Sequence, residues 1–176
     1  MLEEASFARE RGALILAEIT GHGCSYDCLN GDDDGVAEAS IALSIQRALH
    51  DAFTLPHEID CLSASANGSP DGDRREAHGL FAGLNGQTHK LPITAIKSML
   101  GETLGAAGPL QVTAMLESMR DGVLPGIQCL QEMDDDFALD QAGPDNEEID
   151  AQTALINSVG IDGHCCSLVL AKCDVN

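Results

Sequence analysis

The chain has 176 residues, which is enough for one domain with a sizeable core and too few for two ordinary domains. Nine lysines and arginines stand against 29 aspartates and glutamates, giving a formal net charge of −20. Such a charge repels phosphate backbones and anionic lipid headgroups, and a chain with one tyrosine and no tryptophan has little aromatic surface for stacking on bases. We therefore expect neither a nucleic-acid nor a membrane partner.

The cysteine content and the first residues bear on the cellular compartment. Seven cysteines are an odd number for a closed disulfide framework. The opening residues show neither the positive charge nor the apolar run of a secretory signal. No apolar segment approaches the roughly 20 residues that span a bilayer. The sequence thus predicts free thiols and a cytoplasmic location.

Strands and helices are predicted to alternate along the chain. Residues 12–23 are rich in β-branched and aliphatic side chains, which indicates a strand, and residues 36–53 carry apolar residues at helical spacing. The remaining predictions are strands at 58–65, 91–96, 154–159 and 166–172, helices at 72–84 and 97–120, and an acidic loop at 128–150. This order predicts one α/β domain over residues 1–176, with a layered mixed sheet and helices.

Local composition predicts several element boundaries. The loop at residues 24–35 contains three consecutive aspartates at 32–34 beside glycines, which is typical of turns and of acidic caps at helix N-termini. Within the helical pattern at 97–120, Pro109 should kink or restart the helix. The Asp-Gly pair at 121–122 should end it.

Four motifs resemble, in order and spacing, the C-terminal half of β-ketoacyl synthases, which have the thiolase fold. They are SANGSPDGDRREA at 65–77, ITAIKSMLGETLGAAG at 93–108, RDGVLPGIQ at 120–128 and INSVGIDGHCCSLVL at 156–170. The opening segment at 2–27 is similar to the connection between the two halves of that fold. The resemblance covers nearly the whole chain and implies the C-terminal half of the thiolase-like fold, with the N-terminal half absent.

The resemblance also implies a site without its catalytic groups. Members of the family use a cysteine nucleophile from the N-terminal half and two histidines that donate hydrogen bonds to a developing oxyanion. Asn67 stands where the His-Gly-Thr motif begins, if the loop before Asp73 is two residues shorter. Glu102 stands at the histidine of the Lys-Ser-x-x-Gly-His motif. An ionised carboxylate only accepts hydrogen bonds, so we expect no catalytic residue in this chain.

Four further residues take their predicted roles from the resemblance. Lys97 and Glu76 match a lysine and a carboxylate that resemble a structural ion pair of the family. Ile161 occupies the position of an aromatic gate, and Asp162 lies beside it. A shorter aliphatic side chain at this tunnel or gate position suggests a pocket that no longer loads acyl chains.

Metal and cofactor sites are not expected. Histidine and cysteine residues cluster at 22–28 and at 164–166, but neither cluster has C-x-x-C or H-E-x-x-H spacing. The aspartate runs at 32–34 and 134–136 lack the alternation and the closing glutamate of a calcium loop.

A synthase-like chain without these groups resembles a chain-length factor, the silent partner of an active ketosynthase in type II polyketide or fatty-acid-like biosynthesis, with an aryl polyene pathway as one subtype. The expected partners are that ketosynthase, a separate N-terminal half, and an acyl carrier protein bound through the synthase. A truncated chain docked on an intact synthase, or a fragment, would share these features. The alternative function is an acyl-thioester hydrolase or decarboxylase that uses Glu102.

Overall fold

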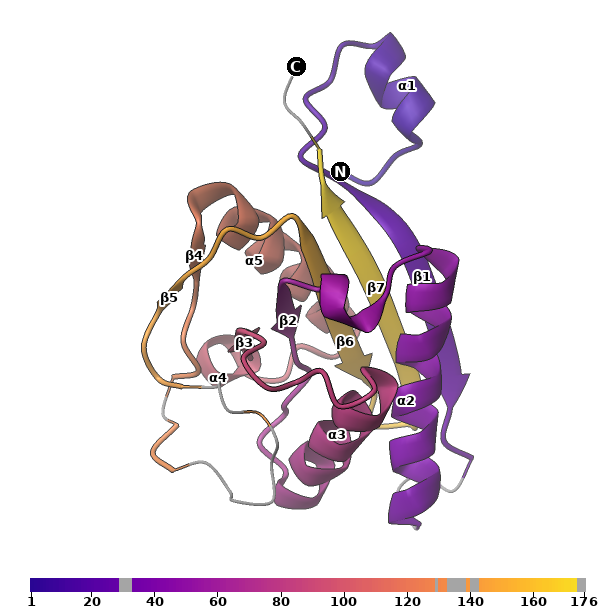
Figure 1. The fold of residues 1–176 in the computed structure, drawn as a ribbon, viewed down its shortest axis with the longest axis vertical. Helices are drawn as coiled ribbons and strands as arrows, with labels where there is room; N and C mark the ends of the chain where they lie inside the picture. The colour runs from indigo at the N-terminus through magenta and orange to yellow at the C-terminus, as the bar shows by residue number, and fades with distance from the viewer. Residues whose placement is uncertain (29–32, 129, 133–138, 140–142, 174–176) are drawn as a thin grey trace.

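The computed structural model describes residues 1–28, 33–128, 130–132, 139 and 143–173, built around a five-stranded mixed sheet (Figure 1). Its strands, in the order β1-β7-β6-β2-β3, are β1 (Ala17–Tyr26), β7 (His164–Lys172), β6 (Thr153–Val159), β2 (Cys61–Ser63) and β3 (Ile93–Thr94). β7 is antiparallel to both its neighbours, whereas β2 is parallel to β6 and to β3. The predicted layered mixed sheet is therefore confirmed.

Helices cover both faces of this sheet. The described helices are α1 (Ala5–Glu10), α2 (Asp34–Asp51), α3 (Pro70–Gly83), α4 (Lys97–Leu100) and α5 (Ala107–Asp121), with 3₁₀ turns η1 (Pro56–Glu58) and η2 (Leu104–Ala106). Of these, α1 lies beyond the end of the sheet (Figure 1). The long helices α2 and α3 lie side by side, and α5 packs against β6 from the other side (Figure 1). No described helix is both long enough and apolar enough to cross a bilayer.

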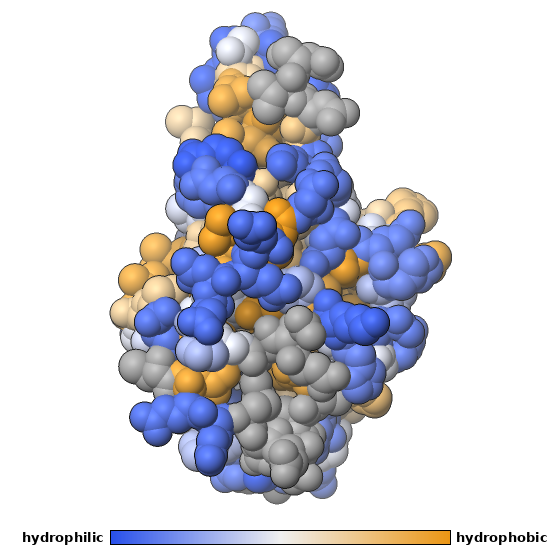
Figure 2. All heavy atoms as spheres, turned by 60° about the vertical axis from the view of Figure 1, so that its left-hand side comes forward, coloured by the Kyte–Doolittle hydropathy of each residue, from blue (hydrophilic) through white to orange (hydrophobic). Residues whose placement is uncertain are grey.

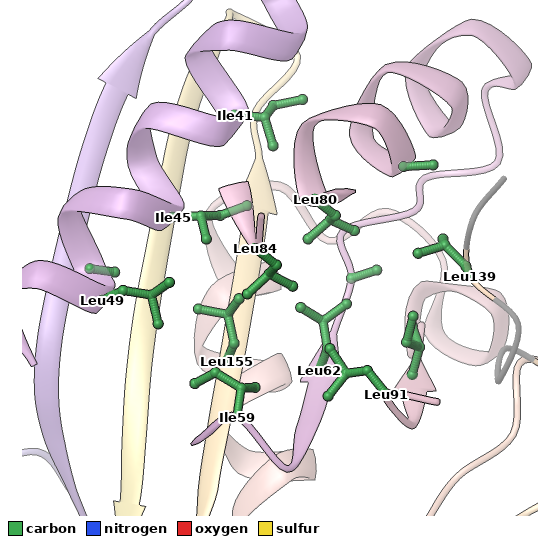
Figure 3. Packing of buried hydrophobic residues seen from close by; sticks show 14 of the residues in the cluster. Ile41, Ile45, Leu49, Ile59, Leu62, Leu80, Leu84, Leu91, Leu139 and Leu155 are labelled. Atoms are coloured by element: carbon green, nitrogen blue, oxygen red, sulfur yellow. The ribbon is translucent and has the colours of Figure 1, made fainter. Parts of the chain in front are cut away.

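Two apolar clusters form the core because successive side chains of a strand point to opposite faces of the sheet. Leu62 and Leu155 face α2 and α3 and pack with Ile45 and Leu80 (Figure 3). Their neighbours along the strands belong to a second cluster that includes α5, whose members are Cys61, Met115, Met119, Leu124, Ala151, Ala154, Ile156 and Leu170. The candidate functional site lies at the edge of the sheet where the strands between these two clusters end.

Two glycines allow α2 to lie directly on β1. A β-carbon built on Gly23 would be 2.0 Å from the carbonyl oxygen of Ser44, and one built on Gly21 would be 2.2 Å from that of Ala48. Any larger residue would collide with the helix backbone. The alternate residues of β1 therefore point to the opposite face of the sheet.

β1 is an edge strand, and side chains of α2 bind three of its backbone polar groups. Asp51 Oδ2 accepts a hydrogen bond from the N–H of His22 at 3.0 Å. Arg47 donates to the carbonyl oxygen of Cys24, and Ser40 donates to that of Tyr26 at 3.4 Å. Helix α2 thus covers both a face and part of the edge of this strand.

The helical pattern at 97–120 is interrupted earlier than predicted. Gly101 has φ of +74° and Leu104 has φ of +51°, so the backbone leaves the helix after α4 and crosses η2. The helix restarts at Ala107, which places Pro109 in the first turn of α5, where its missing N–H costs nothing. Gly122 ends α5 in the left-handed conformation, as the sequence predicted.

Other boundaries also differ from the sequence predictions. The first long strand begins at Ala17 rather than at residue 12 and extends to Tyr26, because its length follows from pairing with β7. Helix α1 was not predicted, and neither was the two-stranded sheet of β4 (Val123–Leu124) and β5 (Glu147–Glu148), the latter within the expected loop.

The acidic cap before α2 is confirmed by Asp33, whose side chain accepts a hydrogen bond from the N–H of Val36 at 3.1 Å. Asp32, Cys129 and the aspartates at 134–136 lie outside the described residues.

Candidate functional site

Ser65 lies in a buried polar cluster just beyond the carboxyl end of β2. Its side-chain oxygen accepts hydrogen bonds from Lys97 Nζ at 2.9 Å and from the N–H of Val159 at 3.1 Å. Lys97 follows β3 and Val159 ends β6. Because β2, β3 and β6 are parallel neighbours, their carboxyl ends meet at one edge of the sheet and bring these three residues together.

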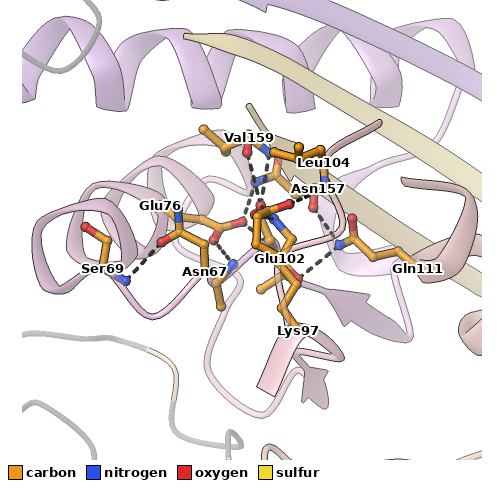
Figure 4. Close-up of polar contacts among 12 residues, drawn as sticks. Asn67, Ser69, Glu76, Lys97, Glu102, Leu104, Gln111, Asn157 and Val159 are labelled. Carbon is orange, nitrogen blue, oxygen red and sulfur yellow. Dashed lines mark hydrogen bonds and ion pairs between the residues drawn. The ribbon is translucent and has the colours of Figure 1, made fainter. Parts of the chain in front are cut away.

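Lys97 and Glu102 form an ion pair in this cluster and point toward each other in Figure 4. The distance from Lys97 Nζ to Glu102 Oε2 is 2.8 Å, and the other carboxylate oxygen accepts a hydrogen bond from the N–H of Leu104. The Lys97 side chain is 5% exposed and that of Glu102 is 31% exposed. The hydrogen bond from Lys97 is the main reason that the pKa of Glu102 is lowered from 4.5.

Glu76 occupies a separate part of the cluster, and this corrects the predicted ion pair with Lys97. Its carboxylate accepts hydrogen bonds from the N–H groups of Ser65 and Ala66, both at 2.7 Å, and from Asn157 Nδ2 at 2.6 Å. Burial raises the pKa of Glu76 above 4.5. Glu76 lies on α3 beside the end of β2, where it binds backbone N–H groups, while Lys97 pairs with Glu102. Ser65 joins the two parts of the cluster, because its N–H donates to Glu76 and its side-chain oxygen accepts from Lys97.

Gln111 links α5 to the same cluster. It is fully buried, and its Nε2 donates to the carbonyl oxygens of Ala64 and Asn157 at 3.0 and 2.9 Å. It also lies 3.2 Å from Ser63 Oγ, and its own oxygen has no hydrogen-bond partner among the described residues. Sequence reasoning did not identify Gln111, which lies outside the four motifs, nor Asn157, which lies in the motif at 156–170 but meets Glu76 only through the fold.

Asn67 lies outside the cluster. Its side chain is exposed and accepts a hydrogen bond from the N–H of Ser69 at 2.9 Å, in the turn that leads into α3. The structure therefore brings Ser65, and not Asn67, into contact with Lys97. Asn67 instead lines a pocket of about 270 Å³ between α2, α3 and the turn that joins β6 to β7.

The two predicted gate residues lie in that turn. Ile161 is 70% exposed and lines the pocket together with Val159 and Asn67. Asp162 Oδ2 is 3.0 Å from His164 Nδ1, and the backbone hydrogen bond from His164 is the main cause of a lowered pKa of Asp162. The side chain of Ile161 thus borders the pocket without closing it.

The histidines and cysteines of residues 22–28 and 164–166 lie on or just beyond the paired strands β1 and β7. Cys24 Sγ is 3.5 Å from His22 Nε2, and Cys165 is buried on a different strand. Among the residues that the structure describes, no three or more metal-ligating side chains are placed to hold an ion.

This architecture is that of the C-terminal half of the thiolase-like fold. Residues 16–130 match the family model described as "Beta-ketoacyl synthase, C-terminal domain". The chain therefore belongs to the β-ketoacyl synthase family.

Known relatives and structures agree with this assignment. The chain is 34% identical over 175 residues to the chloroplastic 3-oxoacyl-[acyl-carrier-protein] synthase II of Arabidopsis thaliana, with 97% of this chain and 32% of the relative covered. It is 32% identical to the oxytetracycline polyketide putative β-ketoacyl synthase 1 of Streptomyces rimosus, over 98% of this chain and 40% of the relative. The structure of "the ishigamide ketosynthase/chain length factor" superimposes with a TM-score of 0.87 at 30% identity, covering 98% of this chain and 42% of that one. The chain thus spans between a third and about two fifths of their length.

The backbone at Ala66 supports a different placement of the His-Gly-Thr motif, one that identifies Ser65. If the His-Gly-Thr motif is placed without the two-residue gap, it falls on Ser65, Ala66 and Asn67. Ala66 has φ of +33°, a conformation that favours glycine, the residue that the motif has there. The ungapped placement is therefore the one that the backbone favours.

Proposed function

We propose that this chain is a non-catalytic subunit, similar to a chain-length factor, that associates with an active ketosynthase in type II polyketide or fatty-acid-like biosynthesis. The observation that supports this most is the ion pair between Lys97 and Glu102 in contact with Ser65. On the ungapped placement, Ser65 and Glu102 are the residues at the two histidine positions of the family motifs.

Neither residue provides what decarboxylative condensation requires. That reaction needs hydrogen-bond donors directed at a developing oxyanion. The lowered pKa of Glu102 keeps it an ionised acceptor at neutral pH, and its charge would oppose that of the oxyanion. Ser65 is 3% exposed and already contacts Lys97 and Val159.

The alternative function, a hydrolase or decarboxylase that uses Glu102, receives less support from this geometry. A general base at neutral pH works best with a pKa near 7. The pKa of Glu102 is moved in the opposite direction, below 4.5, by Lys97.

Two comparisons support the proposed partners. The ishigamide structure is described as a ketosynthase and chain length factor, and another structure, at 25% identity and a TM-score of 0.88, as a type II carrier protein in complex with its ketosynthase. We infer that this chain works with an active ketosynthase and with an N-terminal half of the fold, because its relatives are more than twice its length. Exposed apolar side chains such as Leu104 and Leu100 are available for contacts with such partners.

Net charge bears on the acyl carrier protein. Carrier proteins are acidic as a class, and this chain carries a formal charge of −20. Like charges repel within roughly 8 Å at physiological salt. We therefore infer that the carrier protein binds through the ketosynthase.

Reconstitution with partners tests the proposal. The chain is co-expressed with an N-terminal half of the fold and with an active ketosynthase, and the products are examined by native mass spectrometry. We expect a defined hetero-complex that elongates carrier-bound thioesters. Because Glu102 takes no part in the chemistry, Glu102→Gln should change turnover less than about twofold, as should the control Glu117→Gln on the exposed side of α5.

Two results would contradict the proposal. One is a monomer that ignores these partners. The other is thioester turnover by the chain alone that Glu102→Gln abolishes and Glu117→Gln preserves, which would establish the enzymatic alternative.

A further inference from the structure

Cys24 and Cys166 lie directly opposite each other on the antiparallel strands β1 and β7. The N–H of Asp27 donates to the carbonyl oxygen of Gly163 at 2.8 Å, so these two residues form a hydrogen-bonded pair at the end of the ladder. Hydrogen-bonded and non-hydrogen-bonded pairs alternate in such a ladder, and the register is unbroken over residues 21–26. Counting back from Asp27, the two cysteines form a non-hydrogen-bonded pair.

This type of pair suits a disulfide bond. Its Cα atoms are about 4.5 Å apart, which is within the range of about 4.4 to 6.8 Å found across disulfides. Gly21 and Gly23 face α2, so the side chains of Cys24 and Cys166 share the opposite face of the sheet. Burial is the main cause that raises the pKa of Cys166 to about 11, and a hydrogen bond with the Cys24 thiol is the second cause.

The surroundings give the two thiols different roles. Cys24 is exposed, whereas Cys166 is half-buried. The Nε2 atom of His22, two residues before Cys24 on the same strand, is 3.5 Å from Cys24 Sγ and is placed to accept the thiol proton. Cys24 is therefore the thiol that an oxidant in solution meets first, and Cys166 is the thiol that follows.

We propose that Cys24 and Cys166 form a redox site that a hydroperoxide converts into a cross-strand disulfide. The Cys24 thiolate, with its proton on His22, attacks one peroxide oxygen and the O–O bond breaks. Cys24 becomes a sulfenic acid, and the departing hydroxide takes the proton from His22 to form water. The Cys166 sulfur then attacks the Cys24 sulfur and breaks its S–O bond, and the second hydroxide leaves as water with the Cys166 proton. The thiols lose two electrons, and hydrogen peroxide is reduced to two waters.

Treating the reduced chain with one equivalent of hydrogen peroxide tests this proposal. We expect the intact mass to fall by that of two hydrogen atoms and to return after reduction. Peptide mapping should identify the bond between Cys24 and Cys166. Since the bond joins the edge strand to its neighbour, the melting temperature of the oxidised chain should be higher than that of the reduced chain.

Neighbouring cysteines provide matched controls. Cys24→Ser and Cys166→Ser should abolish the mass loss, whereas Cys165→Ser, adjacent in sequence but on the opposite face, and Cys28→Ser should preserve it. In Cys166→Ser, the sulfenic acid at Cys24 has no resolving thiol and should be trapped by a cyclic dione. A mass loss that persists in Cys166→Ser would overturn the proposal, and so would overoxidation of Cys24 in the unmodified chain without a disulfide.

Discussion

At the scale of single residues, Glu76 is an acid that the fold surrounds with hydrogen-bond donors. It is 4% exposed, and both of its oxygens accept hydrogen bonds, two of them from backbone N–H groups. Burial outweighs these bonds and raises its pKa, so the folded chain holds this proton to a higher pH than the unfolded chain does.

Glu76→Gln tests this arrangement. The amide can accept hydrogen bonds through only one of its two terminal atoms, which leaves at least one of the three donors facing an NH₂ group. We expect the variant to lose about 1–3 kcal/mol of unfolding free energy at pH 5, measured by urea denaturation. The exposed Glu117→Gln should change it by less than about 0.5 kcal/mol.

The difference in unfolding free energy between the unmodified chain and Glu76→Gln should depend on pH. An acid with a raised pKa in the folded state contributes stability below its unfolded pKa, near 4.5, and loses it as the pH rises through the folded pKa. The unfolding free energy of the unmodified chain should therefore fall relative to that of Glu76→Gln between pH 4.5 and pH 7. A difference that widens with pH would show that the pKa of Glu76 is lowered by folding.

At the scale of elements, the approach of α2 to β1 depends on residues without a β-carbon. Gly23→Ala would place a methyl group 2.0 Å from the Ser44 carbonyl oxygen and 2.6 Å from the backbone nitrogen of Ala48. Because both contacts are backbone atoms, the helix as a whole would have to move. We expect a loss of about 3 kcal/mol or more in thermal or urea unfolding.

A glycine with open space around it is the matched control. Among the described residues, no atom other than those of Gly105 and its chain neighbours lies within 4 Å of a β-carbon built on Gly105, and Gly105→Ala should stay within about 0.5 kcal/mol of the unmodified chain. Equal effects of the two substitutions would mean that α2 does not rest on β1 as described.

At the scale of the whole molecule, like charge acts against compactness. The formal charge is −20, and the face drawn in Figure 2 is mostly hydrophilic with scattered hydrophobic patches. Salt shortens the reach of the repulsion from roughly 30 Å at 0.01 M to about 3 Å at 1 M. The melting temperature should therefore rise with sodium chloride concentration, and potassium chloride should act equally. A falling melting temperature would mean that exposed ion pairs outweigh the repulsion.

The order of strands and helices could be predicted because periodicity and glycine positions report on local structure. The short strands β4 and β5 could not, since their pairing joins residues more than 20 positions apart in the sequence. In the site, Lys97 and Glu102 were identified through motifs, but the partner of Lys97 depends on where Gly101 turns the chain. Ser65 could not be predicted, because a two-residue gap before Asp73 places the start of the His-Gly-Thr motif on Asn67. Only the fold shows the backbone conformation of Ala66 that favours the placement without a gap.

The hydrogen bonds from α2 to the edge of β1 also affect how the sheet meets other chains. An edge strand with free backbone groups is a template on which a strand of another molecule can add. Three outward backbone groups of β1, the N–H of His22 and the carbonyl oxygens of Cys24 and Tyr26, are already bonded to side chains of α2. A strand from another molecule would have to displace all three of these hydrogen bonds. This edge of the sheet therefore resists strand addition and the aggregation that follows from it.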